Sequence, residues 1–178
     1  MVKRTDPDGV SPVVGVMLML IVTIIIAAVV SAFAGGMSTE TTKAPQATIS
    51  GSYSISRGMT FTHNGGDPIG TPSLKVVVHP AESFGTSTHL IDTVNMSSIT
   101  DGDGVPWLKG NGLFGVKTFR PGDTAFILPP YHEAPWLQPS ASYVSYFNNT
   151  ANIGKTFWIE LLDPRGKMIA KTEVTIDP

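Results

Sequence analysis

The chain of 178 residues has no cysteine and little charge. The absence of cysteine excludes disulfides, thiolate metal ligands and a cysteine nucleophile. The formal net charge of −2 argues against a nucleic-acid partner, which would need a basic surface. The sequence also has no Gly-x-Ser-x-Gly motif and no phosphate-binding glycine loop. We therefore expect no catalytic residues, no cofactor and no enzymatic activity.

The sequence also lacks a clustered pattern of metal ligands. The four histidines, at positions 63, 79, 89 and 132, are dispersed along the chain, so we expect no metal site. The acidic segment Asp101–Gly104 lacks the later oxygen ligands that a calcium loop requires. We interpret this segment as a tight turn.

Charge is missing altogether between Asp8 and Glu40. Within this interval, Val10 to Gly36 is apolar on every face of a helix. As a helix, residues 12–34 would be about 33 Å long, which matches a hydrocarbon core of about 30 Å. The sequence therefore predicts one helix that is long and apolar enough to span a membrane.

Three interpretations of this apolar segment are open. A secretory signal would be cut after Ala32-Phe33-Ala34, which fits the small-x-small pattern. An uncleaved anchor would hold an external domain at the membrane. A segment cut on its cytoplasmic side would remain part of the mature protein. For an inserted helix, Lys3 and Arg4 place residues 1–9 in the cytoplasm and residues 40–178 outside.

Three short motifs carry a resemblance to one family. Residues 9–16, GVSPVVGV, precede the aliphatic segment and resemble the N-terminus of archaeal type IV pilins. Residues 61–69, FTHNGGDPI, are similar to the THxGGDP turn of that family. Residues 120–125, RPGDTA, resemble more weakly the GD-x-A motif that occurs later in its sequences. The residues that match the family turn are His63, Gly65, Gly66, Asp67 and Pro68.

This resemblance implies that a prepilin peptidase cleaves between Gly9 and Val10. The retained helix would then pack into a filament core. Small residues spaced by four allow helices to approach closely, although such residues are also simply common in membrane helices. The expected helix-packing residues are Ser11, Pro12, Gly15, Ala28, Ala32 and Gly36.

Beyond residue 44 the apolar residues alternate with polar ones, and the segments are separated by glycine and proline turns. This pattern predicts an α+β chain with a long N-terminal hydrophobic α-helix followed by an all-β, Ig-like sandwich. The expected divisions are a leader (1–9), the helix (10–36), a connector (37–44) and the β-sandwich (45–178). Strands are expected at 49–55, 59–63, 74–79, 113–119, 125–128, 156–162 and 168–176, with a tight turn at 163–166.

Two further features concern the surface. Asn95-Met96-Ser97 and Asn148-Asn149-Thr150 are N-glycosylation sequons, so Asn95 and Asn148 are possible acceptors in an external domain. Aromatic residues gather in irregular segments, where they would either bind a partner or attach long loops to the core. These residues are Trp107, Tyr131, Trp136, Tyr143, Tyr146 and Phe147.

We interpret the chain as a structural, pilin-like subunit. It would be a membrane protein before assembly and afterwards part of an extracellular filament used for adhesion. The resemblance implies four partners: copies of the chain, the prepilin peptidase, an assembly ATPase and its membrane platform. The alternatives are a monomeric membrane-anchored binding module, a minor tip subunit and, third, an enzyme whose site the linear sequence hides.

Overall fold

The computed structural model describes residues 12–36 and 44–178. Internal contacts divide the chain into two units, Met1–Thr42 and Lys43–Pro178. The first unit contains the helix α1. The second contains the β-domain, by which we mean residues 44–178. Each unit is described by itself.

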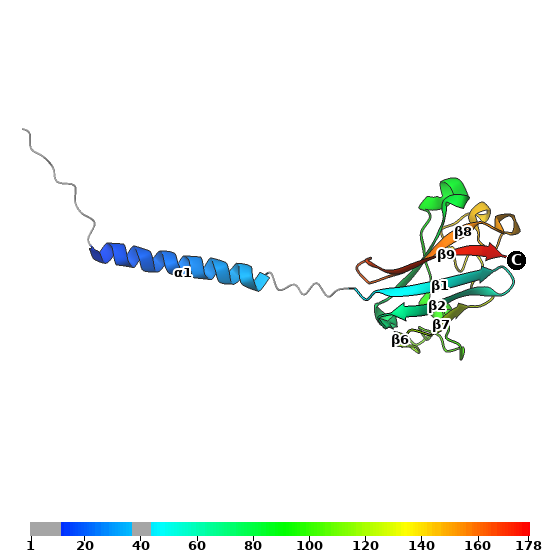
Figure 1. Ribbon diagram of the computed structural model, residues 1–178, viewed down its shortest axis with the longest axis horizontal. Helices are drawn as coiled ribbons and strands as arrows, with labels where there is room; N and C mark the ends of the chain where they lie inside the picture. Colours follow the sequence, from blue (N-terminus) through cyan, green and yellow to red (C-terminus); the bar gives the residue numbers. More distant parts are fainter. Residues whose placement is uncertain (1–11, 37–43) are drawn as a thin grey trace, which may run out of the picture. The chain divides into compact units, whose positions relative to one another are not determined.

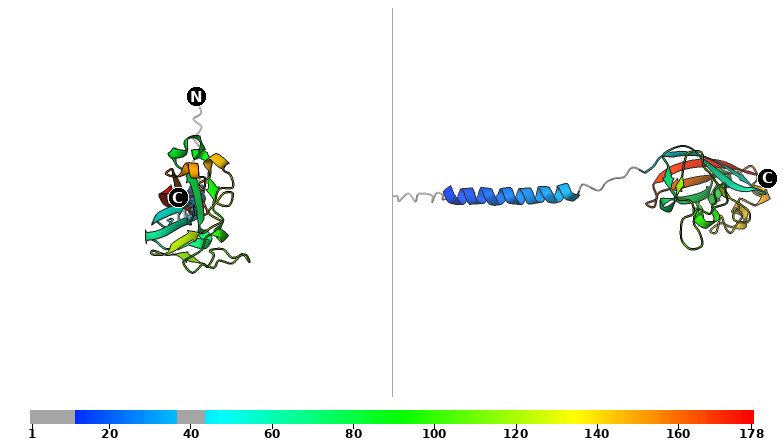
Figure 2. Two further views of the ribbon diagram at one scale, coloured as in Figure 1. Left: turned by 90° about the vertical axis from the view of Figure 1, so that its right-hand side faces the viewer. Right: turned by 90° about the horizontal axis from the view of Figure 1, so that it is seen from below.

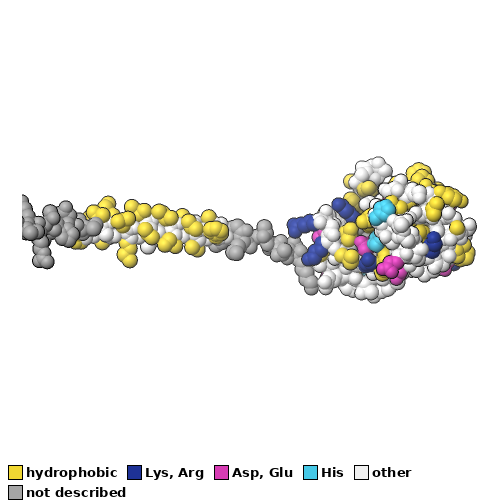
Figure 3. Space-filling model, turned by 90° about the horizontal axis from the view of Figure 1, so that it is seen from above, with side chains coloured by type: hydrophobic (Ala, Val, Ile, Leu, Met, Phe, Trp, Pro, Cys, Tyr) yellow, Lys and Arg dark blue, Asp and Glu magenta, His cyan; other side chains and the backbone are white. Residues whose placement is uncertain are grey.

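Helix α1 runs from Pro12 to Gly36 (Figure 1). Pro12 is its first residue, where the missing N–H would have no helical partner in any case. The hydroxyl of Thr23 donates a hydrogen bond to the carbonyl oxygen of Leu20 at 2.9 Å, so this polar group needs no external partner. All side chains from residue 12 to residue 33 are exposed, and Figure 3 shows apolar side chains along the visible face.

The described residues of the β-domain form nine strands. In chain order they are β1 (Ala47–Ser54), β2 (Gly58–Gly66), β3 (Ile69–Gly70), β4 (Lys75–Pro80), β5 (Asp92–Thr93), β6 (Thr118–Phe119), β7 (Thr124–Ile127), β8 (Thr156–Leu162) and β9 (Met168–Asp177). Short 3₁₀ turns connect several of them: η1 (Thr71–Ser73), η2 (Glu82–His89), η3 (Met96–Ser98), η4 (Tyr143–Ser145) and η5 (Thr150–Asn152).

Seven strands form one curled sheet in the order β5-β4-β8-β9-β1-β2-β7, and β3 pairs with β6 in a separate ribbon (Figures 1 and 2). The neighbours are antiparallel except β1 and β9, which are parallel and pair only at Tyr53–Ile176 and Ser54–Asp177. This short pairing links a β5-β4-β8-β9 half to a β1-β2-β7 half. The α+β class is confirmed, and the β part is a curled sheet.

Buried and partly exposed residues alternate along the strands, and the buried ones form the core. On β8, Phe157, Ile159 and Leu161 are buried, and the residues between them are partly exposed. Phe147 stacks on Phe157 with ring centroids 4.0 Å apart. A second aromatic group in the same core consists of Phe61, Trp107 and Phe119, whose ring centroids are 5.2–5.7 Å apart. Such tilted and edge-on contacts are favourable beyond their buried area.

One expected strand is wrong over most of its length. Of residues 113–119, only Thr118 and Phe119 are in a strand, β6. The preceding segment folds back instead, because Phe114 bridges Leu108 and the N–H of Gly115 donates to the carbonyl oxygen of Trp107. Burial of the Trp107 ring therefore outweighs the local strand preference.

The tight turn expected at 163–166 is confirmed. The N–H of Gly166 donates to the carbonyl oxygen of Asp163 at 2.9 Å. The side chain of Asp163 accepts from the N–H groups of Arg165 and Lys167 at 2.9 and 2.8 Å. An Asp side chain bonded to the backbone in this way is typical of turns.

Gly51 provides a test of the close packing between β1 and the β8-β9 pair. A methyl group at Gly51 would lie 2.7 Å from Cγ2 of Val174 and 3.0 Å from Cδ1 of Ile159. We expect Gly51→Val to lower the free energy of unfolding by about 1–3 kcal/mol because it overpacks the core, although valine favours strands. Urea titration measures this change. Gly70→Val is the matched control, since nothing lies within 4 Å of a methyl group there. Equal stabilities of the two variants would contradict the close packing.

Candidate functional site

The surface of α1 is the first candidate site. Residues 12–33 are long and apolar enough to cross a membrane, and none of their surface is buried in the structure. Of the expected packing residues, Pro12, Gly15, Ala28 and Ala32 lie exposed on α1 and Gly36 is its last residue, whereas Ser11 lies outside the described residues. A methyl group at Gly15 would meet no atom within 4 Å, so packing within this chain does not require glycine there.

The expected cleavage residues, Gly9 and Val10, also lie outside the described residues. The cleavage position therefore stays a prediction of the sequence.

The family turn at His63–Pro68 is the second candidate site. Nε2 of the buried His63 donates a hydrogen bond to the carbonyl oxygen of Asp67 at 3.0 Å and so closes the turn across its base. The imidazole ring packs against Phe119 with centroids 5.2 Å apart. Gly66 has a φ of +106°, and a side chain there would collide with the backbone of Gln46. The turn therefore requires glycine at this position for both conformation and space.

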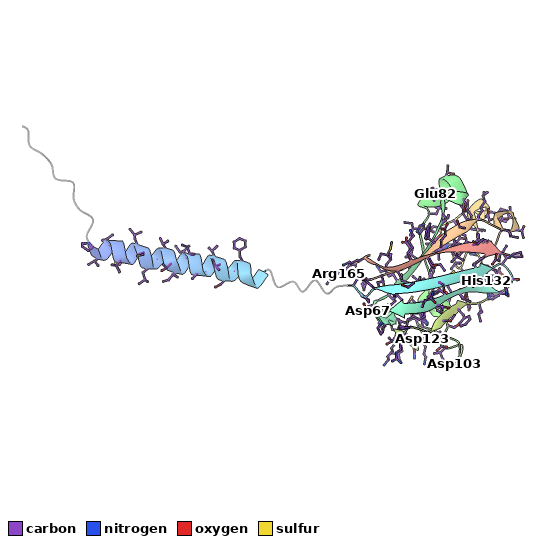
Figure 4. All side chains as sticks on the ribbon, in the orientation of Figure 1. Asp67, Glu82, Asp103, Asp123, His132 and Arg165 are labelled. Carbon is purple, nitrogen blue, oxygen red and sulfur yellow. The ribbon has the colours of Figure 1, made fainter. Side chains whose placement is uncertain are left out.

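This turn holds the first residues of the β-domain. The N–H of Gln46 donates to Oδ2 of Asp67 at 3.1 Å, and the N–H of Asp67 donates to the carbonyl oxygen of Gln46 at 2.8 Å. Figure 4 labels Asp67 near the end of the domain where β1 begins. The paired bonds thus fix the backbone just before β1.

The weaker motif, residues 120–125, meets the turn in space. The N–H of His63 donates to the carbonyl oxygen of Asp123 at 2.9 Å, and the N–H of Gly122 donates to the carbonyl oxygen of His63 at 2.7 Å. The carboxylate of Asp123 accepts from the N–H of Arg120 at 2.8 Å. Two motifs that are far apart in the sequence therefore form one hydrogen-bonded corner, with His63 at its centre.

The other three histidines each form hydrogen bonds in a different part of the β-domain. Nδ1 of His89 bonds the carbonyl oxygen of Thr86, and Nε2 of His132 donates to the carbonyl oxygen of Ile55. His79 lies on β4 with its Nε2 3.0 Å from Oε1 of Glu160. Within residues 12–36 and 44–178, no group of three potential metal ligands comes together.

Glu160 is the centre of a small charged cluster on the outer face of the sheet. Its Oε1 also lies 3.0 Å from Nζ of Lys171, which is stacked over the ring of Trp158 at 4.0 Å. Burial alone would raise the pKa of Glu160, but the hydrogen bonds from His79 and Lys171 outweigh it and lower the pKa below its usual value. The cluster links β4, β8 and β9.

The acidic segment Asp101–Gly104 forms the expected tight turn. Oδ1 of Asp101 accepts hydrogen bonds from the N–H groups of Asp103 and Val105 at 3.0 and 2.8 Å. The N–H of Gly104 donates to the carbonyl oxygen of Asp101. One oxygen of the Asp101 carboxylate therefore already accepts two hydrogen bonds from the backbone of its own turn.

The two sequons differ in accessibility. Asn95 is exposed, and its Oδ1 accepts from the N–H and hydroxyl of Ser97 within the same turn. Asn148 is half-buried, and its Oδ1 accepts from the N–H of Ala134, in another loop, at 3.4 Å. An enzyme that attaches a glycan would therefore reach Asn95 more easily.

The aromatic residues of the irregular segments differ in exposure, and Tyr146 is intermediate. Trp107 and Phe147 are buried in the core, whereas Tyr143, Trp136 and Tyr131 are 73%, 60% and 46% exposed. Burial of Trp107 and Phe147 agrees with a role in attaching the loops to the core, and the exposed rings remain candidates for binding a partner. Which of these aromatic rings are exposed is known only from the folded structure.

The loops that carry the exposed rings are firmly held. The buried Gln138 donates from Nε2 to the carbonyl oxygen of Ser145 at 3.1 Å and accepts from the N–H of Phe147 at 2.6 Å. The hydroxyl of Tyr53 donates to the carbonyl oxygen of His132 at 3.2 Å. Burial raises the pKa of Tyr53, and the carboxylate of Glu133 adds to this, so the hydroxyl remains a donor.

Comparison with known proteins bears on the N-terminal part of the chain. The family described as archaeal type IV pilin, N-terminal, matches residues 8–49. This range contains all of α1 and ends inside β1. A protein of Archaeoglobus fulgidus, described only as uncharacterized, is 39% identical over 110 residues, which cover 55% of this chain and 76% of that protein.

Asp67 tests whether the family turn fixes the start of the β-domain. We expect Asp67→Ala to speed amide hydrogen exchange at Gln46 and to lower the free energy of unfolding by about 1 kcal/mol, because the N–H of Gln46 loses its acceptor. Exchange measured by NMR and a urea titration provide the two readouts. Asp67→Asn keeps an acceptor oxygen and should behave like the wild type. If exchange at Gln46 is unchanged in Asp67→Ala, the bond does not restrain this segment.

Proposed function

Because the chain belongs to the archaeal type IV pilin N-terminal family, we propose that it is a structural subunit that polymerises through α1 into an extracellular filament. The β-domain forms the outer wall of this filament and carries adhesion. Pilins are structural proteins, so the proposal assigns no catalytic role.

One observation supports this proposal above the others: α1 is apolar on all sides and its side chains are exposed from residue 12 to residue 33. In a bilayer, such a helix gains little by meeting another, because lipid is equally apolar. Once extracted from lipid, it must bury that surface against other helices, at roughly 25 cal/mol per Å² of apolar area. Copies of α1 provide the matching surface.

The proposed pathway begins in the membrane. The precursor is inserted with residues 1–9 in the cytoplasm and the β-domain outside. A prepilin peptidase cleaves between Gly9 and Val10, and an assembly ATPase with its membrane platform moves the subunit into the filament. In the assembled helix core, Ala28 and Ala32 allow the close approach of neighbours, and Gly15 does the same one turn from the N-terminal end.

N-linked glycan is proposed at Asn95 in preference to Asn148. The side chain of Asn95 is exposed, and the hydrogen bonds that this side chain accepts come only from Ser97. A glycan there would add solubility and steric cover to the outer wall.

The experiment that tests the pathway is determination of the mature N-terminus. Material collected from the cell surface is analysed by intact mass and terminal sequencing. We expect the chain to start at Val10, because cleavage there keeps α1 in the mature protein. A start at Met1 would indicate a monomeric membrane-anchored module instead, and a start at Gly35 a secreted β-domain. Either result would contradict filament assembly through α1.

Assembly through α1 is tested by placing a charge in its middle. We expect Val22→Glu to abolish filaments, because a carboxylate cannot be buried among apolar helices without a partner. The same outcome is expected for Ile25→Glu. Filaments are counted by electron microscopy of sheared material, with Val22→Leu as the control that keeps the surface apolar. Membrane fractions show whether the variant is still inserted. Normal filaments from an inserted Val22→Glu protein would argue against helix packing as the driving interaction.

A further inference from the structure

A small hollow lies in the loop between β7 and β8. It has a volume of about 170 Å³ and is lined by Tyr143, Tyr146, Asn148, Asn149 and Thr150. Its loop is anchored near the last residues of β1, where the ring of Phe147 lies 6.2 Å from that of Tyr53. Figure 4 labels His132, whose ring also packs on Tyr53, at the end of the domain opposite Asp67.

The walls of the hollow combine aromatic rings with neutral polar groups. Tyr143 and Tyr146 meet edge to face, with centroids 6.1 Å apart, and Tyr143 is 73% exposed. The other lining groups are two amides and a hydroxyl, so none of the five side chains carries a charge. Such a lining favours a neutral ligand over a phosphate, a metal ion or an acidic peptide.

The loop is already fixed in one conformation. Asn149 accepts from the N–H of Ala151 at 3.0 Å and donates to the carbonyl oxygen of Tyr143 at 3.1 Å. The buried Asn152 donates from Nδ2 to the carbonyl oxygens of Val144 and Tyr146, both at 2.8 Å. A ligand that binds here therefore does not have to order the loop, and binding loses less entropy.

We infer that this hollow binds one pyranose ring of a carbohydrate on a surface outside the cell. The apolar C–H face of a sugar matches the exposed ring of Tyr143, and its hydroxyl groups match the amide of Asn148 and the hydroxyl of Thr150. A filament presents many copies of the hollow at once, so weak individual sites add to strong attachment. This inference rests on the proposed function and gives its adhesion a ligand class.

The test applies sheared filaments of the full chain to immobilised neutral oligosaccharides that end in glucose, galactose, mannose or N-acetylglucosamine. We expect retention of wild-type filaments on at least one of them and at least a tenfold loss for Tyr143→Ala. Tyr143→Phe keeps the ring and should be retained. Tyr131→Ala removes another exposed ring outside the hollow and should also be retained.

Several outcomes would overturn the inference. These are equal retention of Tyr143→Ala, no retention of the wild type on any oligosaccharide, and a mass showing that native Asn148 already carries a glycan. Loss of filaments in Tyr143→Ala alone would assign the ring to a contact between subunits instead. All these results leave filament formation by the wild type intact. The proposed function fails separately, if the wild type forms no filaments.

Discussion

The apolar surface of α1 is the constraint on which the protein depends. From residue 12 to residue 33 the helix offers no charged group, and its side chains are exposed. The hydroxyl of Thr23 donates to the carbonyl oxygen of Leu20, so this polar group is satisfied within the helix. Such a surface is stable only in lipid or against other apolar helices. The location of the protein is therefore limited to places where this surface can be covered.

The β-domain meets a different requirement, because it lacks disulfides and must depend on its core. Aromatic rings meet on both halves of the curled sheet, around Phe157 in one half and Phe61 in the other. The turn at His63–Pro68 joins this core to the backbone that precedes β1, through the bonds of Asp67 to Gln46. The backbone that enters β1 is thus held by a hydrogen-bonded corner.

Different features lie at the two ends of the β-domain. The family turn lies at the end where β1 begins, and the loops with exposed aromatic rings lie at the other, around His132 (Figure 4). These loops are long and irregular, yet Gln138 and Asn152 bond them to one another and to themselves. Because these loops are already ordered, a ring such as Tyr143 can contact a ligand with little further loss of conformational entropy.

The sequence by itself determined the helix, the β character of the rest and the turns at 101–104 and 163–166, because periodicity, glycine and short polar side chains act locally. The motif at residues 9–16 also indicated the pilin family, whose N-terminal domain matches residues 8–49. Only the tertiary structure decided that residues 113–117 leave the strand pattern, that the two distant motifs meet at His63, and which aromatic rings are buried. Those outcomes depend on contacts between segments far apart in the chain, which no local pattern records.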